Sequence, residues 1–342
     1  MTTTSIPTTS KPTFDTCYYH RGCSDGICAA WIVRCEYPNL KFIGIAPNVN
    51  INTDKKTGET HDDIAEYTYK NKEVIFVDVC PGKDLLEKMC ALAKRIVILD
   101  HHKTNRETIE SFNTSNSPSN LETVFDMTRA GCQIAWDYIY TVCPNNGGTN
   151  LDLNNRWFVD YIADRDLWTW KLKDSKHINS ALHGLGYSRN FEGFDKLDCE
   201  GSCIIESELL PFAKAIDIQN EQMLKRYVYH SKWCRMNVKG TYYNVWVASS
   251  YELRSELGNR LVHRGHRNED GTETMPDFAV MWTYNFEGHE WWVSLRASQD
   301  TDMDVSAIAK QMDPNGGGHP KAAGFTYKSD TTEQIHDFLE LL

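Results

Sequence analysis

Carboxylate and imidazole side chains follow three short runs of β-branched or aromatic residues in the first third of the chain. Asp100, His101 and His102 come directly after one run, Asp78 follows another, and Asp25 lies a few residues beyond the third. Carboxylates that converge raise one another's pKa unless a cation lies between them. Oxygen and imidazole ligands without thiolates favour manganese or magnesium over zinc. These residue types therefore predict a divalent-metal centre.

The elements that would position these residues alternate between strands and helices. Each polar cluster closes a predicted strand, and Asp164 closes a later predicted helix that begins near residue 154. The alternation predicts an α/β fold with a doubly wound, mostly parallel sheet. Such sheets bind ligands outside the carboxyl ends of their strands, which is where all three clusters fall.

The second half of the chain no longer alternates between strands and helices. The whole chain has 342 residues, a length that suits two domains. Helical periodicity over 204–232 predicts a connector that breaks near Pro211, and paired strands follow, with a turn in the sequence EGHE. The predicted layout is a disordered tail over 1–13, an α/β domain over 14–203, the connector helix over 204–232, and a smaller α+β domain over 233–342.

Composition excludes several classes of protein. Lys and Arg number 36 against 47 Asp and Glu, a net charge of −11, so we expect no binding of long duplex nucleic acid. Apolar runs are far shorter than the roughly 20 residues of a membrane span, so we expect no membrane association. Eleven scattered cysteines without a CxxC pair indicate a reducing compartment, and we expect the cytoplasm.

Six motifs occur in an order that resembles a known family. YYHRGCSDGICAAW, FVDVCPG, ILDHHKTN and ADRDLW resemble the four motifs of the DHH phosphoesterase superfamily, and SLRAS and NGGGHPKAAGF resemble its accessory DHHA1 domain. The resemblance spans residues 14–327. It implies a DHH domain over 14–203 that holds the metals, and a DHHA1 domain over 233–342 that clamps the substrate across an interdomain cleft.

The resemblance implies two divalent ions, with Mn²⁺ preferred and Mg²⁺ the alternative. Asp78 would bridge the ions, Asp25, His101 and Asp164 would complete one of them, and His20 would serve the other. Two such ions can hold a phosphate, activate water and stabilise a leaving oxygen.

The remaining motif residues of this domain have roles nearer to the substrate. His102 would face the scissile phosphate, and Asp100 would orient the histidines. Cys23 stands where many family members carry an aspartate, and both a thiolate ligand and a packed thiol remain open. Arg165 and Asp166 flank Asp164, and surface salt bridges are the favoured interpretation.

The DHHA1-like motifs indicate a site for substrate phosphate. Arg296 and Ser298, at the end of a predicted strand, resemble the family's phosphate contacts. Gly316, Gly317 and Gly318 would let backbone N–H groups approach a phosphate or a base, with His319 and Lys321 adding charge. A flexible loop is the alternative for the glycines. Trp168 could stack on a base, although tryptophans near helix ends more often fill a core.

The combined hypothesis is a metal-dependent phosphodiesterase or exoribonuclease that acts on short oligonucleotides or dinucleotides by a two-metal mechanism. Cyclic dinucleotides and nucleoside bisphosphates are alternative substrates. The alternative from a different class of function is a catalytically weakened protein that only binds or sequesters a nucleotide. The cysteine at position 23, where many family members carry an aspartate, favours this alternative. A homodimer is compatible with the sequence.

Overall fold

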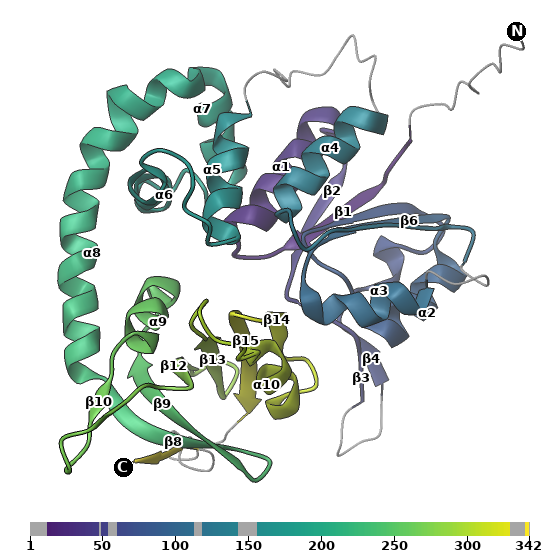
Figure 1. The fold of residues 1–342 in the computed structure, drawn as a ribbon. Coiled ribbons are helices and arrows are strands. Elements are labelled where there is room, and N and C mark those ends of the chain that lie inside the picture. Colours follow the sequence, from purple (N-terminus) through teal and green to yellow (C-terminus); the bar gives the residue numbers. More distant parts are fainter. Residues whose placement is uncertain are drawn as a thin grey trace, which may run out of the picture. The chain divides into compact units, whose positions relative to one another are not determined.

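The computed structural model describes residues 12–47, 49–53, 60–112, 118–142, 156–328 and 339–341. These residues form two compact units (Figure 1). The first unit consists of the described residues up to His101 together with 108–209, and the second consists of 102–107 together with 210–342. The tail predicted over 1–13 lies outside the described residues except for its last two positions.

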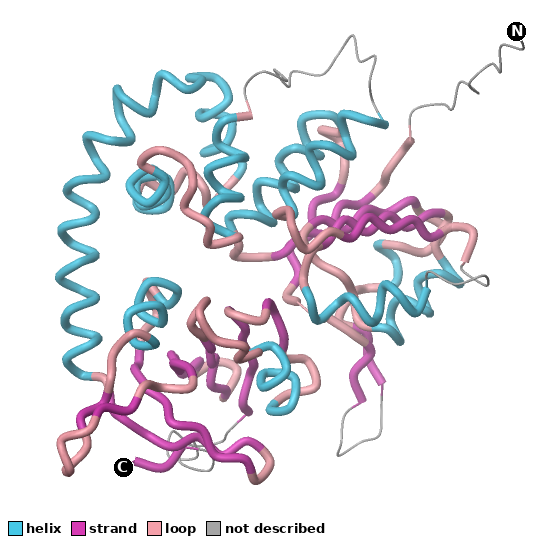
Figure 2. The backbone as a smooth tube through the Cα atoms, viewed as in Figure 1, coloured by secondary structure: helices cyan, strands magenta, loops and turns pink. Residues whose placement is uncertain are grey.

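A five-stranded parallel sheet forms the centre of the first unit (Figure 2). In spatial order its strands are β2 (Lys41–Ile45), β1 (Thr16–His20), β5 (Glu73–Val77), β6 (Arg95–Asp100) and β7 (Leu121–Phe125). The sequences EVIFV and RIVILD of β5 and β6 are almost entirely buried, as expected for parallel strands covered on both faces. All carboxyl ends of the strands therefore meet at one edge.

Helices cover both faces of this sheet. Helices α1 (Ser24–Glu36) and α4 (Gly131–Val142) lie side by side on one face, and α2 (Lys83–Leu92) and α3 (Arg106–Phe112) lie on the other (Figure 1). The short strands β3 (Ile51–Thr53) and β4 (Thr60–Asp62) pair with each other. A 3₁₀ turn at Glu66–Thr68 completes this part, and a second one at Lys103–Asn105 belongs to the second unit.

A helical region follows the sheet. It contains α5 (Trp157–Asp166), α6 (Ser175–Gly184), α7 (Phe191–Glu200), a 3₁₀ turn at Gly201–Cys203, a π-helical turn at Ile205–Leu209, and α8 (Leu210–His230). The break predicted near Pro211 corresponds to the π-helical turn, because proline donates no hydrogen bond and its ring clashes with the carbonyl four residues earlier. None of the described helices is both long and apolar enough to cross a membrane.

A mixed seven-stranded sheet forms the second unit. Its spatial order is β14 (Gly317–His319), β15 (Ala322–Lys328), β13 (Glu290–Arg296), β12 (Phe278–Asn285), β9 (Thr241–Ser249), β8 (Lys232–Val238) and β16 (Leu339–Leu341). Only β9 and β12 run parallel. The hairpin predicted at EGHE is present, since Asn285 pairs with Glu290.

The two faces of this sheet have separate apolar cores. Helix α10 (Val305–Met312) packs on one face with Val280 and Val293, and α9 (Arg254–Val262) packs on the other with Ala279 and Met281. Strands β10 (His266–Arg267) and β11 (Glu273–Thr274) form a small separate ribbon. The predicted fold class is confirmed: a parallel α/β sheet, a helical middle, and a smaller C-terminal α+β domain.

Candidate metal centre

Three buried side chains converge at the carboxyl edge of the parallel sheet. Asp25 is the second residue of α1, Asp78 follows β5, and His101 follows β6. One ligand atom from each lies within 4.8 Å of the other two. The Nε2 atom of His101 is 3.0 Å from Asp78 Oδ1 and 3.5 Å from Asp25 Oδ2. The structure thus brings together three of the residues that the sequence singled out as ligands.

Two further side chains flank this cluster. His20 is the last residue of β1, and its Nδ1 atom lies 3.3 Å from Asp78 Oδ2. Asp166 is the last residue of α5, and its Oδ2 atom lies 3.6 Å from His101 Nε2. The first unit therefore gathers three carboxylates and two imidazoles, a donor set that suits hard or borderline divalent ions.

The electrostatics of the cluster also fit a cation. Burial and the charges of Asp78 and Asp166 raise the pKa of Asp25 well above its usual range. Burial lowers the pKa of His101, but its hydrogen bond with Asp78 and the charges of Asp166, Asp78 and Asp25 outweigh this and raise that pKa well above the usual value. Buried carboxylates at such distances are compensated best by bound divalent metal.

The amino terminus of α4 holds the carboxylate of Asp25. The backbone N–H groups of Gly131 and Cys132 donate to it over 2.6 and 2.8 Å. A Cβ atom at Gly131 would lie 2.6 Å from Asp78 Cβ and 2.8 Å from Asp78 Oδ1, and one at Gly26 would lie 2.5 Å from the His20 carbonyl oxygen. Both glycines are thus required for the close approach of the ligands, a role that the sequence interpretation missed.

Gly131→Ala is expected to displace Asp78 and weaken metal binding. We expect a loss of metal affinity of roughly 10–100-fold, as for other changes around metal ligands. Calorimetric titration of the metal-free protein with Mn²⁺ measures it. Cys132→Ala is the matched control because it keeps the backbone N–H that binds Asp25. Equal affinity in Gly131→Ala and the control would show that the cluster tolerates the extra carbon.

Asp78 itself adopts a left-handed backbone conformation. Its φ angle is +59°, and its N–H donates to the Leu99 carbonyl oxygen over 2.8 Å. Aspartate tolerates this conformation better than most residues but still at a cost of about 1–3 kcal/mol. Strain of this kind is typical of functional sites, and here it falls on the residue expected to bridge the ions.

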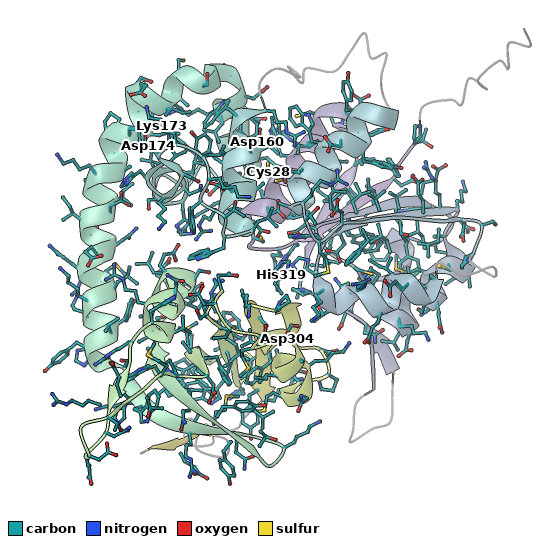
Figure 3. All side chains as sticks on the ribbon, viewed as in Figure 1. Cys28, Asp160, Lys173, Asp174, Asp304 and His319 are labelled. Atoms are coloured by element: carbon teal, nitrogen blue, oxygen red, sulfur yellow. The ribbon has the colours of Figure 1, made fainter. Side chains whose placement is uncertain are left out.

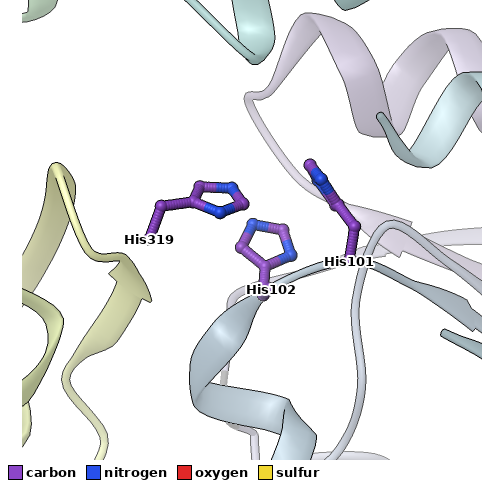
Figure 4. Close-up of side chains that lie close together, drawn as sticks. All are labelled: His101, His102 and His319. Atoms are coloured by element: carbon purple, nitrogen blue, oxygen red, sulfur yellow. The ribbon is translucent and has the colours of Figure 1, made fainter. Parts of the chain in front are cut away.

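The histidine pair after β6 divides between the two units. His101 belongs to the first unit and is held by Asp100, whose Oδ1 atom accepts the His101 N–H over 2.8 Å. His102 belongs to the second unit, where its ring stacks on His319 with 4.8 Å between ring centroids (Figure 4). Both rings are half-buried.

Asp164 lies outside the cluster of ligands. Its carboxylate accepts the N–H groups of Lys171 and Leu172 over 2.8 and 3.1 Å, together with the hydroxyl of Thr169. Burial would raise the pKa of Asp164, but hydrogen bonds from Ser175, Thr169 and this backbone lower it. Asp164 thus holds the turn after α5, and Asp166 is the carboxylate of this motif that approaches His101.

The turn held by Asp164 contains two tryptophans. Trp168 and Trp170 have φ angles of +57° and +51°, and their rings meet edge to face with centroids 4.9 Å apart. The ammonium of Lys176 lies 5.5 Å from the centre of the Trp170 ring. Trp168 is half-buried, so stacking on a base stays a prediction.

Cys23 lies at the position that precedes α1. Burial and the charges of Asp78, Asp166 and Asp25 raise its pKa well above the usual value, which favours the neutral thiol in the metal-free protein. In the described part of the chain, no cluster of potential ligands includes Cys23. This placement favours the packed thiol of the two interpretations.

The predicted phosphate contacts of the second unit lie at the carboxyl end of strand β13 and in the turns beside it. Arg296 ends β13 and is 8% exposed, and Ser298 lies in the following turn, where its hydroxyl accepts the Asp300 N–H over 3.2 Å. The ammonium of Lys321 donates to the backbone carbonyls of Thr301 and, over 3.0 Å, of Met303. Lys321 thus supports a loop in addition to any contact with substrate.

The three glycines of the second unit have packing roles. A Cβ atom at Gly316 would lie 2.4 Å from the Ala309 carbonyl oxygen, and one at Gly317 would lie 2.8 Å from the Thr104 side chain. Gly318 has a φ angle of +136°, which side chains rarely adopt. Their strand leads to His319, and Asp304 begins the neighbouring α10 as its N-cap (Figure 3).

Comparison with known proteins agrees with this organisation. Residues 268–342 match the model of the DHHA1 domain. The C-terminal part of the chain therefore carries a DHHA1 domain, as the motifs SLRAS and NGGGHPKAAGF led us to expect.

Individual proteins resemble the chain over most of its length. The uncharacterized protein R106 of Acanthamoeba polyphaga mimivirus is 27% identical over 328 residues, which cover 93% of this chain and 68% of that protein. The pGpG-specific phosphodiesterase PggH from Vibrio cholerae is similar with a TM-score of 0.40, 11% identity, and coverage of 95% of this chain and 97% of that one. RecJ from Thermus thermophilus, solved with Mn²⁺, has a TM-score of 0.44, 12% identity, and coverage of 92% and 50%.

Proposed function

We propose that this chain hydrolyses phosphodiester bonds in dinucleotides and short oligonucleotides, using two divalent ions held by the first unit. The observation that carries the proposal is the buried cluster of Asp25, Asp78 and His101 at the carboxyl edge of the sheet. Bound there, divalent ions would polarise the phosphate and lower the pKa of an attacking water. Mn²⁺ is the ion that we propose, with Mg²⁺ as the alternative.

The residues around the cluster have distinct parts in this proposal. Asp78 lies between His101 and His20 and is the candidate bridging ligand. Asp166, at 3.6 Å from His101, replaces Asp164 in the ligand set that we propose. Asp100 orients the His101 backbone, and the amino terminus of α4 orients Asp25, so that the donors are fixed before metal arrives.

The second unit supplies the groups proposed to bind substrate. Arg296 and His319 lie on the two strands that flank β15, since both residues pair with Ala322 of that strand. A guanidinium is suited to a phosphate group, and the His102 ring that stacks on His319 is proposed to face the scissile phosphate. The ten described cysteines are all free thiols, which supports the proposal of a reducing, cytoplasmic setting.

The proposal includes a preference for short substrates. A net charge of −11 leaves few cationic side chains to track a long phosphate backbone, so each nucleotide beyond the first few adds repulsion in place of contacts. We therefore expect kcat/KM to peak between two and about five nucleotides and to fall steadily as length increases.

A substrate panel tests this function directly. Purified protein with Mn²⁺ or Mg²⁺ is incubated with dinucleotides, RNAs of increasing length, cyclic dinucleotides and nucleoside bisphosphates, and the products are separated. We expect the fastest turnover on dinucleotides and short RNAs, with the Asp78→Asn protein as the background control. Efficiency that stays level or rises with length would contradict the short-substrate proposal, and turnover of bisphosphates alone would replace it with a phosphatase.

A further inference from the structure

Two helices of the first unit each hold one carboxylate of the metal centre. The amino terminus of α4 binds Asp25 through the backbone N–H groups of Gly131 and Cys132, and α5 ends at Asp166. Asp25 and Asp166 lie 3.5 and 3.6 Å from the same atom, His101 Nε2. The angle between α4 and α5 therefore helps to set the distance between these two carboxylates.

A network of ion pairs joins α4 to the start of α5. Arg156 occupies the position that precedes α5, and its Nη1 atom lies 2.9 Å from Oδ1 of Asp137 in α4. Its Nε atom lies 3.1 Å from Oδ1 of Asp160, in the first turn of α5 (Figure 3). One guanidinium thus contacts a carboxylate on each helix. Its planar fork suits two such contacts, because its donors point in fixed directions.

Further side chains hold both carboxylates of this network. Arg129, in the turn between β7 and α4, has its Nη1 atom 2.8 Å from Oδ2 of Asp137. The side-chain amide of Gln133 in α4 donates to Asp160 over 3.3 Å, which is a second polar contact between the two helices. Because both of its partners are themselves held, Arg156 has fewer ways to rearrange than the members of a single exposed ion pair.

Helix α5 is packed in its middle, between the network at one end and Asp166 at the other. Its buried apolar residues are Phe158, Val159, Ile162 and Ala163. Asp166 lies four residues beyond Ile162, or about 6 Å along the helix, so a tilt of about 10° around this middle would move Asp166 by about 1 Å. Metal–ligand distances tolerate deviations of only about 0.2 Å. Contacts that fix the tilt of α5 therefore matter for metal binding.

We propose that Arg156 is a positioning residue for the metal centre, because its ion pairs with Asp137 and Asp160 fix the angle between α4 and α5. This inference rests on the proposed function, since it takes Asp166 as a metal ligand. The three side chains of these pairs are between 30% and 44% exposed, and ion pairs at such positions contribute little to stability. Loss of Arg156 should therefore alter metal affinity more than stability.

Titration of the metal-free protein with Mn²⁺ tests the proposal without any substrate. Arg156→Gln removes a positive charge, which by electrostatics alone would tighten the binding of a cation. The positioning role predicts the opposite sign, a loss of Mn²⁺ affinity of roughly 10-fold, as for other residues that orient metal ligands. Arg156→Lys keeps the charge but not the planar fork, so we expect a smaller loss. Affinity of Arg156→Gln equal to or above that of the wild type would overturn the proposal.

Arg95→Gln is the matched control for the change of charge. Arg95 forms an ion pair with Glu122 that joins β6 to β7, and its side chain is 28% exposed against 30% for Arg156. We expect Arg95→Gln to bind Mn²⁺ at least as tightly as the wild type, and both variants to melt in EDTA within about 4 °C of it. An equal loss of affinity in Arg95→Gln and Arg156→Gln would show a general effect and overturn the proposal.

The Asp166→Asn background shows whether Arg156 acts through this ligand. There, Arg156→Gln should cause no further loss of Mn²⁺ affinity, because the carboxylate that it positions is already gone. A further loss of the same size would contradict the proposed role. The outcome is separate from the proposed activity: a protein that hydrolyses no dinucleotide can still show this pattern. Conversely, hydrolysis of dinucleotides together with unchanged Mn²⁺ affinity in Arg156→Gln would overturn the inference and retain the function.

Discussion

Replacing Asp78 by asparagine is expected to abolish turnover while the protein remains folded. Asp78 lies 3.0 Å from His101 and 3.3 Å from His20, so its carboxylate is the one that can contact donors on both sides of the cluster. The change removes the negative charge but keeps the size of the side chain, and asparagine tolerates the left-handed conformation at φ +59°. We expect kcat to fall by three orders of magnitude or more, or roughly 4 kcal/mol of barrier.

Two measurements besides activity define this prediction. The metal content per chain should fall. The melting temperature of the metal-free protein should stay level or rise, because the substitution removes the repulsion between Asp78 and Asp25, which raises the pKa of Asp25 in the wild type. Asp84→Asn is a suitable control, since Asp84 is an exposed residue of α2 outside the cluster. Near wild-type turnover of Asp78→Asn at saturating Mn²⁺ would exclude Asp78 as the bridging ligand.

The sequence was informative where function depends on regular geometry. Asp78 and His101 directly follow two neighbouring parallel strands, which must present them at one edge, so alternation of strands and helices was sufficient to predict their convergence with Asp25. The α/β class and the mixed C-terminal sheet could be predicted for the same reason. These inferences need only the period of each element and the order of the elements along the chain.

The sequence was less informative where function depends on how elements approach one another. Gly131 is needed because α4 comes close to Asp78, a distance that no local pattern records. Gly316 in the second unit resembles a phosphate-binding glycine, yet its immediate neighbour is the Ala309 carbonyl oxygen.

The ADRDLW motif illustrates the same limit with two competing carboxylates. Asp164 and Asp166 stand two residues apart at the end of α5, and successive helical residues are rotated by about 100°, so the two side chains leave the helix in very different directions. Which one reaches the metal depends on how α5 packs against the sheet. The structure places Asp166 against His101, whereas the Asp164 carboxylate accepts the backbone N–H groups of Lys171 and Leu172.

We therefore expect Asp166→Asn to impair metal binding and turnover, and Asp164→Asn to lower thermal stability. Asp166→Asn removes a carboxylate from the cluster, so metal content and kcat should fall by at least roughly 100-fold while the melting temperature of the metal-free protein changes little. Asp164→Asn keeps the cluster but loses charged hydrogen bonds to Lys171 and Leu172, which typically contribute about 1.5–3 kcal/mol each. Its melting temperature should fall by several degrees, about 2–4 °C for each kcal/mol in a domain of this size, while it still binds the metal.

Comparing the Asp164→Asn and Asp166→Asn variants is informative because each variant is the control for the other. Both replace an aspartate by its amide within three residues of sequence, and both are measured for metal stoichiometry by calorimetric titration and for stability by thermal unfolding in EDTA. A Trp168→Phe variant, unfolded in parallel, shows how far the turn that Asp164 holds contributes to stability on its own. If Asp164→Asn loses the metal while Asp166→Asn retains it, then Asp164 is the ligand when metal is bound, and the turn after α5 must rearrange to release its carboxylate.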